Sequence, residues 1–264
     1  NGHEWPTPDL EPIHRDFVPA DLVAVTAMAG VDATVLVQSQ PADSDTDWML
    51  DVADDCPLIQ GVVGWADLAA PDALERLTEL AKRPKLKGIR PMLQGMSDET
   101  WILRDDVRPA LKALSNLGLR FDALIFTRHL PAIDQLAKAF PDLPVIVDHC
   151  AKPPIADNAP AAVQAWRDGI ARVAENPNVV CKLSGLFTEM RPDQPLDAAL
   201  PFADHVLSTF GPERLMWGSD WPVVLLRQPY AAWLDWTKAW LGGKTAEVHT
   251  AVLGSTARRV YALP

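Results

Sequence analysis

The sequence predicts a parallel α/β fold of the (β/α)8 TIM-barrel type, in a single domain that spans residues 1–264. Three observations lead to this prediction. Short apolar runs alternate with helical segments along the chain. The length of 264 residues is close to the roughly 250 residues typical of such barrels. Several of the apolar runs end in polar side chains, and parallel barrels gather their chemistry at the carboxyl ends of the strands.

The composition narrows the class of protein. The chain has 24 Lys and Arg against 35 Asp and Glu, a net charge of −11, and no basic cluster, so we expect no nucleic-acid partner. It contains no run of about 18 apolar residues and no basic-then-apolar leader, so we expect a cytoplasmic protein with no membrane partner. Cys56, Cys150 and Cys181 show no Cys-x-x-Cys spacing and are expected to be reduced core residues.

The elements are expected in regular alternation. Residues 1–17 are rich in Pro, Asp and Glu and follow neither period, which predicts an irregular arm. A helix should then begin at Pro19 and end at Gly30. Seven strands are expected at residues 31–38, 60–66, 86–91, 121–126, 144–149, 179–184 and 215–220. Helices are expected around residues 48–52, 71–83, 107–114, 130–140, 163–173, 199–210, 233–240 and 245–261.

A barrel agrees with this pattern better than a doubly wound open sheet. The open sheet would need a glycine-rich nucleotide turn or a topological switch, and the chain has neither G-x-G-x-x-G nor a Walker loop. A closed barrel needs eight strands, and the first element after the arm is a helix. We therefore expect a first strand upstream of Asn1.

Four motifs, in order along the chain, carry a family resemblance. They are Lys87-Gly88-Ile89-Arg90, Val147-Asp148-His149 with Lys152-Pro153-Pro154, Lys182-Leu183-Ser184-Gly185, and Trp217-Gly218-Ser219-Asp220-Trp221-Pro222. Together they resemble the amidohydrolase-2 branch of the amidohydrolase superfamily. Within it the chain is most similar to the L-fuconolactonase, L-rhamnonolactonase and 2-pyrone-4,6-dicarboxylate lactonase families. The resemblance implies a distorted (β/α)8 barrel that hydrolyses lactone esters at the carboxyl ends of its strands.

The sequence departs from the family pattern at one place. The first strand of the family ends in His-x-His, whereas the six histidines here are isolated: His3, His14, His129, His149, His205 and His249. The resemblance implies one divalent metal ion, most readily zinc, with His149 and Asp220 as provisional ligands. A metal-independent reaction remains the alternative.

Asp220 and His149 are the candidate catalytic residues. Each ends an apolar strand. Asp220 matches the last-strand aspartate of the family and suits a general base that takes a proton from water, although an Asp before a proline also caps turns. His149 matches the family histidine as a ligand to metal or to the lactone oxygen, although a lone His in an apolar run is often a core residue.

Four further residues are expected to bind substrate: Arg90, Lys182, His129 and Trp221. An arginine at a strand end can grip a carboxylate or a polarised carbonyl, or it can serve in a structural ion pair. Lys182 can do the same or extend its amine from the strand to solvent. Trp221 suits packing against a sugar ring.

Lactone hydrolysis is the function that these residues favour. Water activated by Asp220 would attack the ester carbonyl of an aldono-1,4-lactone type of substrate. A decarboxylase or isomerase of the same superfamily, acting on a related carboxylic acid, is the alternative, and a catalytically inactive binding barrel is the third. The expected partner is a small-molecule lactone, and the protein is expected to be a monomer or a small homo-oligomer in carbohydrate metabolism.

Overall fold

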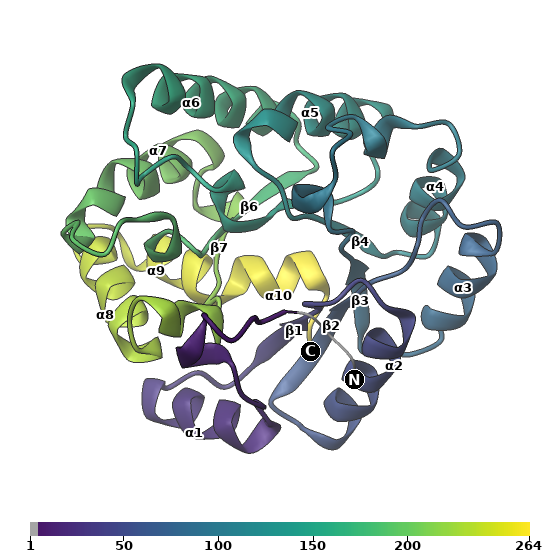
Figure 1. Ribbon diagram of the computed structural model, residues 1–264, viewed down its shortest axis with the longest axis horizontal. Coiled ribbons are helices and arrows are strands. Elements are labelled where there is room, and N and C mark those ends of the chain that lie inside the picture. Colours follow the sequence, from purple (N-terminus) through teal and green to yellow (C-terminus); the bar gives the residue numbers. More distant parts are fainter. Residues whose placement is uncertain (1–4) are drawn as a thin grey trace.

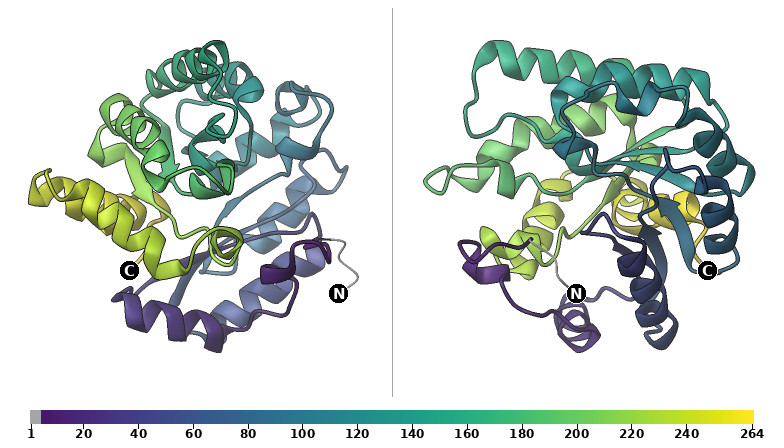
Figure 2. Two further views of the ribbon diagram at one scale, coloured as in Figure 1. Left: turned by 60° about the vertical axis from the view of Figure 1, so that its left-hand side comes forward. Right: turned by 45° about the vertical axis from the view of Figure 1, so that its right-hand side comes forward.

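One curled parallel sheet forms the centre of the molecule. The computed structural model describes residues 5–264, so His3 and the start of the predicted arm lie outside the described residues. The seven strands follow one another in the sheet in chain order, from β1 to β7. Helices surround the outer side of the sheet (Figures 1 and 2). Because a doubly wound sheet reverses its strand order at a switch point, this sequential order confirms the predicted barrel class.

The strands are β1 (Thr34–Val37), β2 (Ile59–Gly64), β3 (Leu86–Ile89), β4 (Arg120–Ala123), β5 (Val145–Val147), β6 (Val179–Leu183) and β7 (Leu215–Trp217). All seven predicted strands are confirmed. Each ends one to three residues before the predicted carboxyl boundary. The polar residues that follow several of the strands lie outside the sheet ladder.

The larger helices are α1 (Pro19–Ala29), α2 (Asp43–Asp55), α3 (Ala73–Leu80), α4 (Arg108–Asn116), α5 (Leu130–Ala139), α6 (Pro160–Ala174), α7 (Leu200–Phe210) and α8 (Tyr230–Leu241). The predicted last helix is one continuous helical stretch of α9 (Ala246–Thr250), a π-helical turn (Ala251–Ser255) and α10 (Thr256–Tyr261). Gly30 ends α1 with a left-handed φ of 69°, as the sequence predicts. No helix within residues 5–264 is long and apolar enough to cross a membrane.

Apolar side chains fill both sides of the sheet. The large core lies between the sheet and the outer helices and includes the fully buried Trp166, Ile133 and Leu111. A smaller cluster fills the barrel interior, where Ile146 and Met216 of the strands pack with Tyr261 of α10. The helix α10 therefore serves as an interior element and lies beside the strands near the middle of the molecule (Figure 1).

Two cationic side chains bind the carboxyl end of α10. Lys87 Nζ donates to the carbonyl of Ala262, and Arg120 Nε donates to the carbonyl of Val260. Positive charge at a helix carboxyl end is favourable because the free carbonyls there carry partial negative charge. These bonds fix α10 against the amino-terminal halves of β3 and β4.

The edges of the sheet are β1 and β7, which do not pair with each other in the described part of the chain. All four residues of β1 are only half-buried. A cavity of about 1110 Å³ lies here, lined by β1, by the segment after β7 and by residues at the carboxyl ends of the strands. The predicted strand upstream of Asn1 stays a prediction.

Candidate active site

A left-handed turn places His149 after β5. Four successive residues, His149, Cys150, Ala151 and Lys152, have φ values between 50° and 57°. A side chain costs roughly 1–2 kcal/mol in this conformation, so other contacts must hold the turn. Lys152 N donates to the His149 carbonyl at 2.8 Å, and the indole of buried Trp166 donates to the Cys150 carbonyl at 2.7 Å. The turn directs His149 into the cavity.

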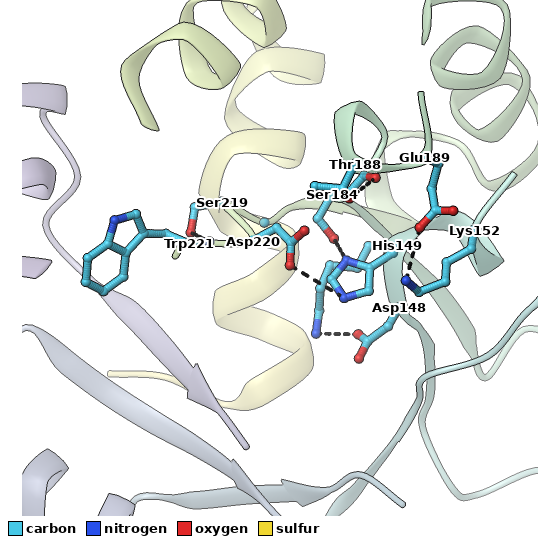
Figure 3. A network of polar contacts seen from close by, with 12 residues as sticks. Asp148, His149, Lys152, Ser184, Thr188, Glu189, Ser219, Asp220 and Trp221 are labelled. Carbon is cyan, nitrogen blue, oxygen red and sulfur yellow. Dashed lines mark hydrogen bonds and ion pairs between the residues drawn. The ribbon is translucent and has the colours of Figure 1, made fainter. Parts of the chain in front are cut away.

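Asp220 reaches the same place from the end of β7. Its own φ is 54°, and its carbonyl accepts the N–H of Val224 at 2.8 Å. Asp220 Oδ1 lies 3.8 Å from His149 Nε2, and each side chain is 13% exposed. Figure 3 shows the two side chains pointing toward one another. The structure thus brings together the two predicted catalytic residues, which are distant in the sequence.

Burial shifts both groups toward their neutral forms. Loss of water contact raises the pKa of Asp220 to about 7, against the opposing positive charges of Lys152 and Arg90. Burial also lowers the pKa of His149 to about 3. His149 is therefore neutral at physiological pH, and Asp220 changes its charge close to neutrality. A carboxylate with such a pKa suits proton transfer near pH 7.

Ser184 and Gly185 support the imidazole from the end of β6. Ser184 Oγ lies 2.8 Å from His149 Nδ1. Gly185 has a φ of 67°, and a Cβ placed there would lie 2.9 Å from His149 Nδ1. The ring therefore packs directly on a position that only glycine fills without displacement.

A buried ion network lies below the pair. Asp148 accepts from Arg90 Nη1 at 2.9 Å and lies 2.6 Å from Lys182 Nζ, which is 2.9 Å from Asp122. Tyr261 OH donates to Asp122 at 2.6 Å. Burial alone would raise the pKa of Asp148, but Lys182 and Arg90 hold it well below its usual range. The network thus balances two cations with two carboxylates.

This network engages N–H groups of Arg90 and Lys182 that could otherwise bind a ligand. Both were predicted to bind substrate, and both line the cavity, but each is largely engaged by buried carboxylates. The buried Nε of Arg90 has no partner among residues 5–264. Their substrate-binding roles stay predictions.

The two other predicted binding residues lie away from the pair. Trp221 lines the cavity, but its ring points away from His149 and packs edge-on against Phe17 at 5.0 Å (Figure 3). His129 is 2% exposed, and its Nδ1 accepts the N–H of Phe126 at 3.1 Å. His129 is not among the residues that line the cavity. The structure brings neither ring against Asp220.

Several residues of the site were not predicted from the sequence. Lys152 and Glu189 form an ion pair of 3.0 Å at the mouth, near His149 (Figure 3). Asp148 was visible only as part of a family motif, and Asp122 as a charge inside an apolar strand. A charged residue in a buried strand requires a counter-charge, and that requirement was the available signal for this network.

The described residues supply two donors for a metal ion, His149 Nε2 and Asp220 Oδ1. A catalytic zinc ion takes three protein ligands as a rule. No group of three or more His, Cys, Asp or Glu side chains converges within residues 5–264. This part of the chain therefore does not fit a complete zinc site.

The chain is similar to known proteins in both sequence and structure. The family model Amidohydro_2, described as amidohydrolase, matches residues 4–263. An L-fucono-1,5-lactonase of Burkholderia ambifaria is 45% identical over 235 residues, which are 88% of this chain and 80% of that protein. An L-fucono-1,5-lactonase of Burkholderia multivorans is 34% identical over 271 residues, covering 99% and 91% of the two chains. The crystal structure of an amidohydrolase from Burkholderia multivorans with zinc bound superposes with a TM-score of 0.89, at 34% identity over 95% of this chain and 90% of that one.

Proposed function

The chain belongs to the amidohydrolase family, and from this premise we propose that it hydrolyses the ester ring of a sugar-acid lactone. The observation that carries the proposal is the approach of Asp220 Oδ1 to His149 Nε2, 3.8 Å apart inside the cavity. Two relatives named L-fucono-1,5-lactonase, at 45% and 34% identity, support the substrate class. No observation favours a decarboxylase or an isomerase over this reading.

The proposed reaction begins with Asp220. Its carboxylate takes a proton from water while the water oxygen attacks the lactone carbonyl carbon. The tetrahedral intermediate then collapses, the bond from the carbonyl carbon to the ring oxygen breaks, and Asp220 returns the proton to the leaving alkoxide. The product is a hydroxy acid, which releases one proton per turnover at neutral pH.

His149 stabilises the oxyanion in this proposal. When the Ser184 hydroxyl donates to Nδ1, the hydrogen of the neutral ring lies on Nε2, on the side that faces Asp220. Nε2–H can then donate to the oxygen that becomes negative. A donor held in place before the reaction is worth about 10²- to 10³-fold in rate.

The proposed reaction does not require a divalent ion, although one could bind at this site. The zinc-bound relative supports it, and His149 and Asp220 are ligand types that zinc accepts. Because two donors are fewer than a catalytic zinc takes, no step is assigned to a metal. The remaining parts of the proposal are a small-molecule partner, a monomer or small homo-oligomer, and a cytoplasmic role in sugar-acid metabolism.

An acid-release assay tests the function. Purified protein is expected to hydrolyse members of a panel of aldono-1,4- and aldono-1,5-lactones, followed with a pH indicator in chelator and again with added zinc. Carbon dioxide release from a related acid, with no acid produced from any lactone, would favour the decarboxylase. Inactivity on the whole panel under both conditions would contradict the proposal.

A further inference from the structure

Lys152 is a cation beside the catalytic pair that keeps free hydrogen-bond donors. It is the last residue of the left-handed turn that carries His149, and it lines the same cavity. Its Nζ lies 3.0 Å from Glu189 Oε1, and each of the two side chains is 21% exposed (Figure 3). An ammonium carries three N–H donors, and Glu189 is its only hydrogen-bond acceptor among residues 5–264. Two donors are therefore free on a side chain that is not fully buried.

The other two cations near the pair are less available. Arg90 donates to Asp148 at 2.9 Å, and Lys182 lies between Asp148 and Asp122, at 2.6 Å and 2.9 Å. Both cations are buried. Turning either of them toward a ligand would leave a carboxylate buried without its counter-charge, which is strongly unfavourable. Lys152 is bound by one partly exposed carboxylate only, so it can turn toward a ligand at lower cost.

The charge of Lys152 acts on both Asp220 and His149. Burial is the main cause of the shifted pKa values of these two residues. Among positive charges, Lys152 has the largest effect on each, and it lowers both pKa values. Because Coulomb interactions weaken with distance, the ammonium lies close to the place where a substrate would react.

The proposed reaction leaves one substrate oxygen without a partner. The tetrahedral intermediate carries three oxygens on the former carbonyl carbon. Asp220 takes a proton from the first, which comes from water, and His149 Nε2 donates to the second, which is the former carbonyl oxygen. The third is the ring oxygen, which becomes an alkoxide when its bond to carbon breaks. A donor held in place beforehand stabilises such a developing negative charge.

We propose that Lys152 is a further catalytic residue, whose ammonium donates a hydrogen bond to the ring oxygen as it leaves, while Glu189 holds the ammonium in place. This inference rests on the proposed lactonase function and assigns the leaving-group side of that reaction. Lys152 keeps its proton throughout, and the proton that the alkoxide receives comes from Asp220. The flexible four-carbon stem lets the ammonium follow the ring oxygen as the ring opens.

A change of the leaving atom tests this role. The aldono-lactone that is hydrolysed fastest is compared with its thiolactone, in which sulfur replaces only the ring oxygen. A thiolate is a weaker base than an alkoxide and a weak hydrogen-bond acceptor, so its departure needs little help from an ammonium. Lys152→Met should lower kcat/KM for the lactone by about 10²- to 10³-fold, the effect of losing one preorganised donor, and should lower the lactone-to-thiolactone ratio at least about tenfold. Because both substrates are assayed on one preparation, partial misfolding does not affect the ratio.

Three further variants separate this role from a structural one. Lys152→Arg keeps a positive donor, so its ratio should lie nearer to wild type than to Lys152→Met. Glu189→Gln breaks the ion pair and keeps the ammonium, so its ratio should change by no more than about fivefold, the scale of a partly exposed ion pair. Lys238→Met is the matched control, because Lys238 is an exposed lysine of α8 that lines the same cavity. Its ratio should equal that of wild type.

The outcomes distinguish this inference from the proposed function. Equal slowing of both substrates in Lys152→Met, or an equally large change of the ratio in Glu189→Gln, would overturn the leaving-group role while the lactonase reaction stands. No hydrolysis of any lactone by the wild-type protein would overturn the reaction, and the role with it.

An isotope effect replaces the ratio if the thiolactone is not turned over. Oxygen-18 at the ring position should slow Lys152→Met more than wild type, because breaking of the bond to the ring oxygen becomes rate-limiting without the ammonium. Equal isotope effects in the two proteins would overturn the role of Lys152.

Discussion

Replacement of Asp220 is expected to have opposite effects on activity and on stability. Asp220→Asn keeps the size of the side chain and removes the base, so kcat should fall at least about a hundredfold. The same change should raise Tm at pH 8 relative to wild type, because it removes a buried charge. Since folding raises the pKa of Asp220 from 3.8 to about 7, the folded state binds the proton more tightly. The stability from that proton is complete below about pH 4 and is lost as pH rises through about 7.

Thermal unfolding at pH 4.5 and pH 8 checks this prediction. The gain in Tm of the variant over wild type should be larger at pH 8. An equal difference at both pH values would show that Asp220 is not held protonated by burial. Near-normal turnover of Asp220→Asn would contradict its role as the base.

The pH dependence of the reaction follows from the same carboxyl group. Asp220 must be ionised to accept a proton, so kcat/KM should rise with pH and level off above about 7. His149, with its pKa lowered to about 3, stays neutral across this range. Initial rates between pH 5 and 8, corrected for spontaneous lactone hydrolysis, measure the profile. A flat profile over this range would contradict the assignment.

Gly185 is predicted to position His149. Gly185→Ala would place a Cβ 2.9 Å from the imidazole, so the ring must shift and kcat should fall about tenfold or more. Gly118→Ala is the matched control, since its φ of 68° carries the same strain and no atom lies within 4 Å of the added Cβ. Both variants should lose stability in urea, and Gly185→Ala should lose more, because the displaced ring adds to the shared backbone strain. Equal kcat values in the two variants would show that Gly185 has no positioning role.

At the scale of single residues, the sequence predicted the positions of Asp220 and His149 better than it predicted their surroundings. Asp220 and His149 stand at strand ends, which a sequence shows directly. The pairing of Arg90 with Asp148 joins residues 58 positions apart, and Lys182 lies 60 positions from Asp122. A charge in a buried strand signals that a counter-charge exists, but a single sequence does not show which distant residue supplies it. For the same reason, the sequence did not predict that buried carboxylates pair with Arg90 and Lys182.

At the scale of elements, strand positions were predictable and strand ends were not. Apolar β-branched runs identify strands, but the point at which a chain leaves the sheet depends on tertiary contacts. The turn after β5 shows this, because its four left-handed residues include neither Gly nor Asn. Local propensity argues against such a turn. The Trp166 indole and the packing around it select the conformation.

Trp166→Phe tests how this turn is held. Loss of the indole N–H leaves the buried Cys150 carbonyl without its 2.7 Å bond, which should lower the free energy of unfolding by about 1–3 kcal/mol. The kcat should also fall, because His149 is part of the turn. Trp240→Phe is the control, since its indole bonds Asp204 at an exposed site and its loss should cost less than about 1 kcal/mol. The measurements are urea unfolding and kcat of both variants. An unchanged kcat in Trp166→Phe would show that the turn keeps its shape without the hydrogen bond.

At the scale of the whole molecule, the βα alternation was sufficient to predict the barrel class. The position of α10 was not predictable, because an amphipathic helix at the end of a chain ordinarily joins the outer ring. Tyr261 and Val260 pack inside the barrel, and Tyr261 bonds to Asp122 there. The ion network thus joins the last helix to the mouth of the barrel.

Tyr261→Phe measures this connection. The change removes a 2.6 Å bond to a buried carboxylate and should lower the free energy of unfolding by about 1.5–3 kcal/mol. Tyr230→Phe is the control, because Tyr230 is also buried and its hydroxyl bonds to no described residue. Urea unfolding of both variants gives the comparison. Equal free energies of unfolding in the two variants would show that the hydrogen bond from Tyr261 to Asp122 does not stabilise the fold.

The interior position of α10 also determines when, during synthesis, the interior packing of the sheet can form. A ribosome makes the chain from its amino end, so all seven strands emerge before residues 256–261, which fill the space between them. Until then Ile146, Val180 and Met216 have no apolar partner from that helix. The apolar cluster inside the sheet can therefore be completed only after residues 256–261 have left the exit tunnel.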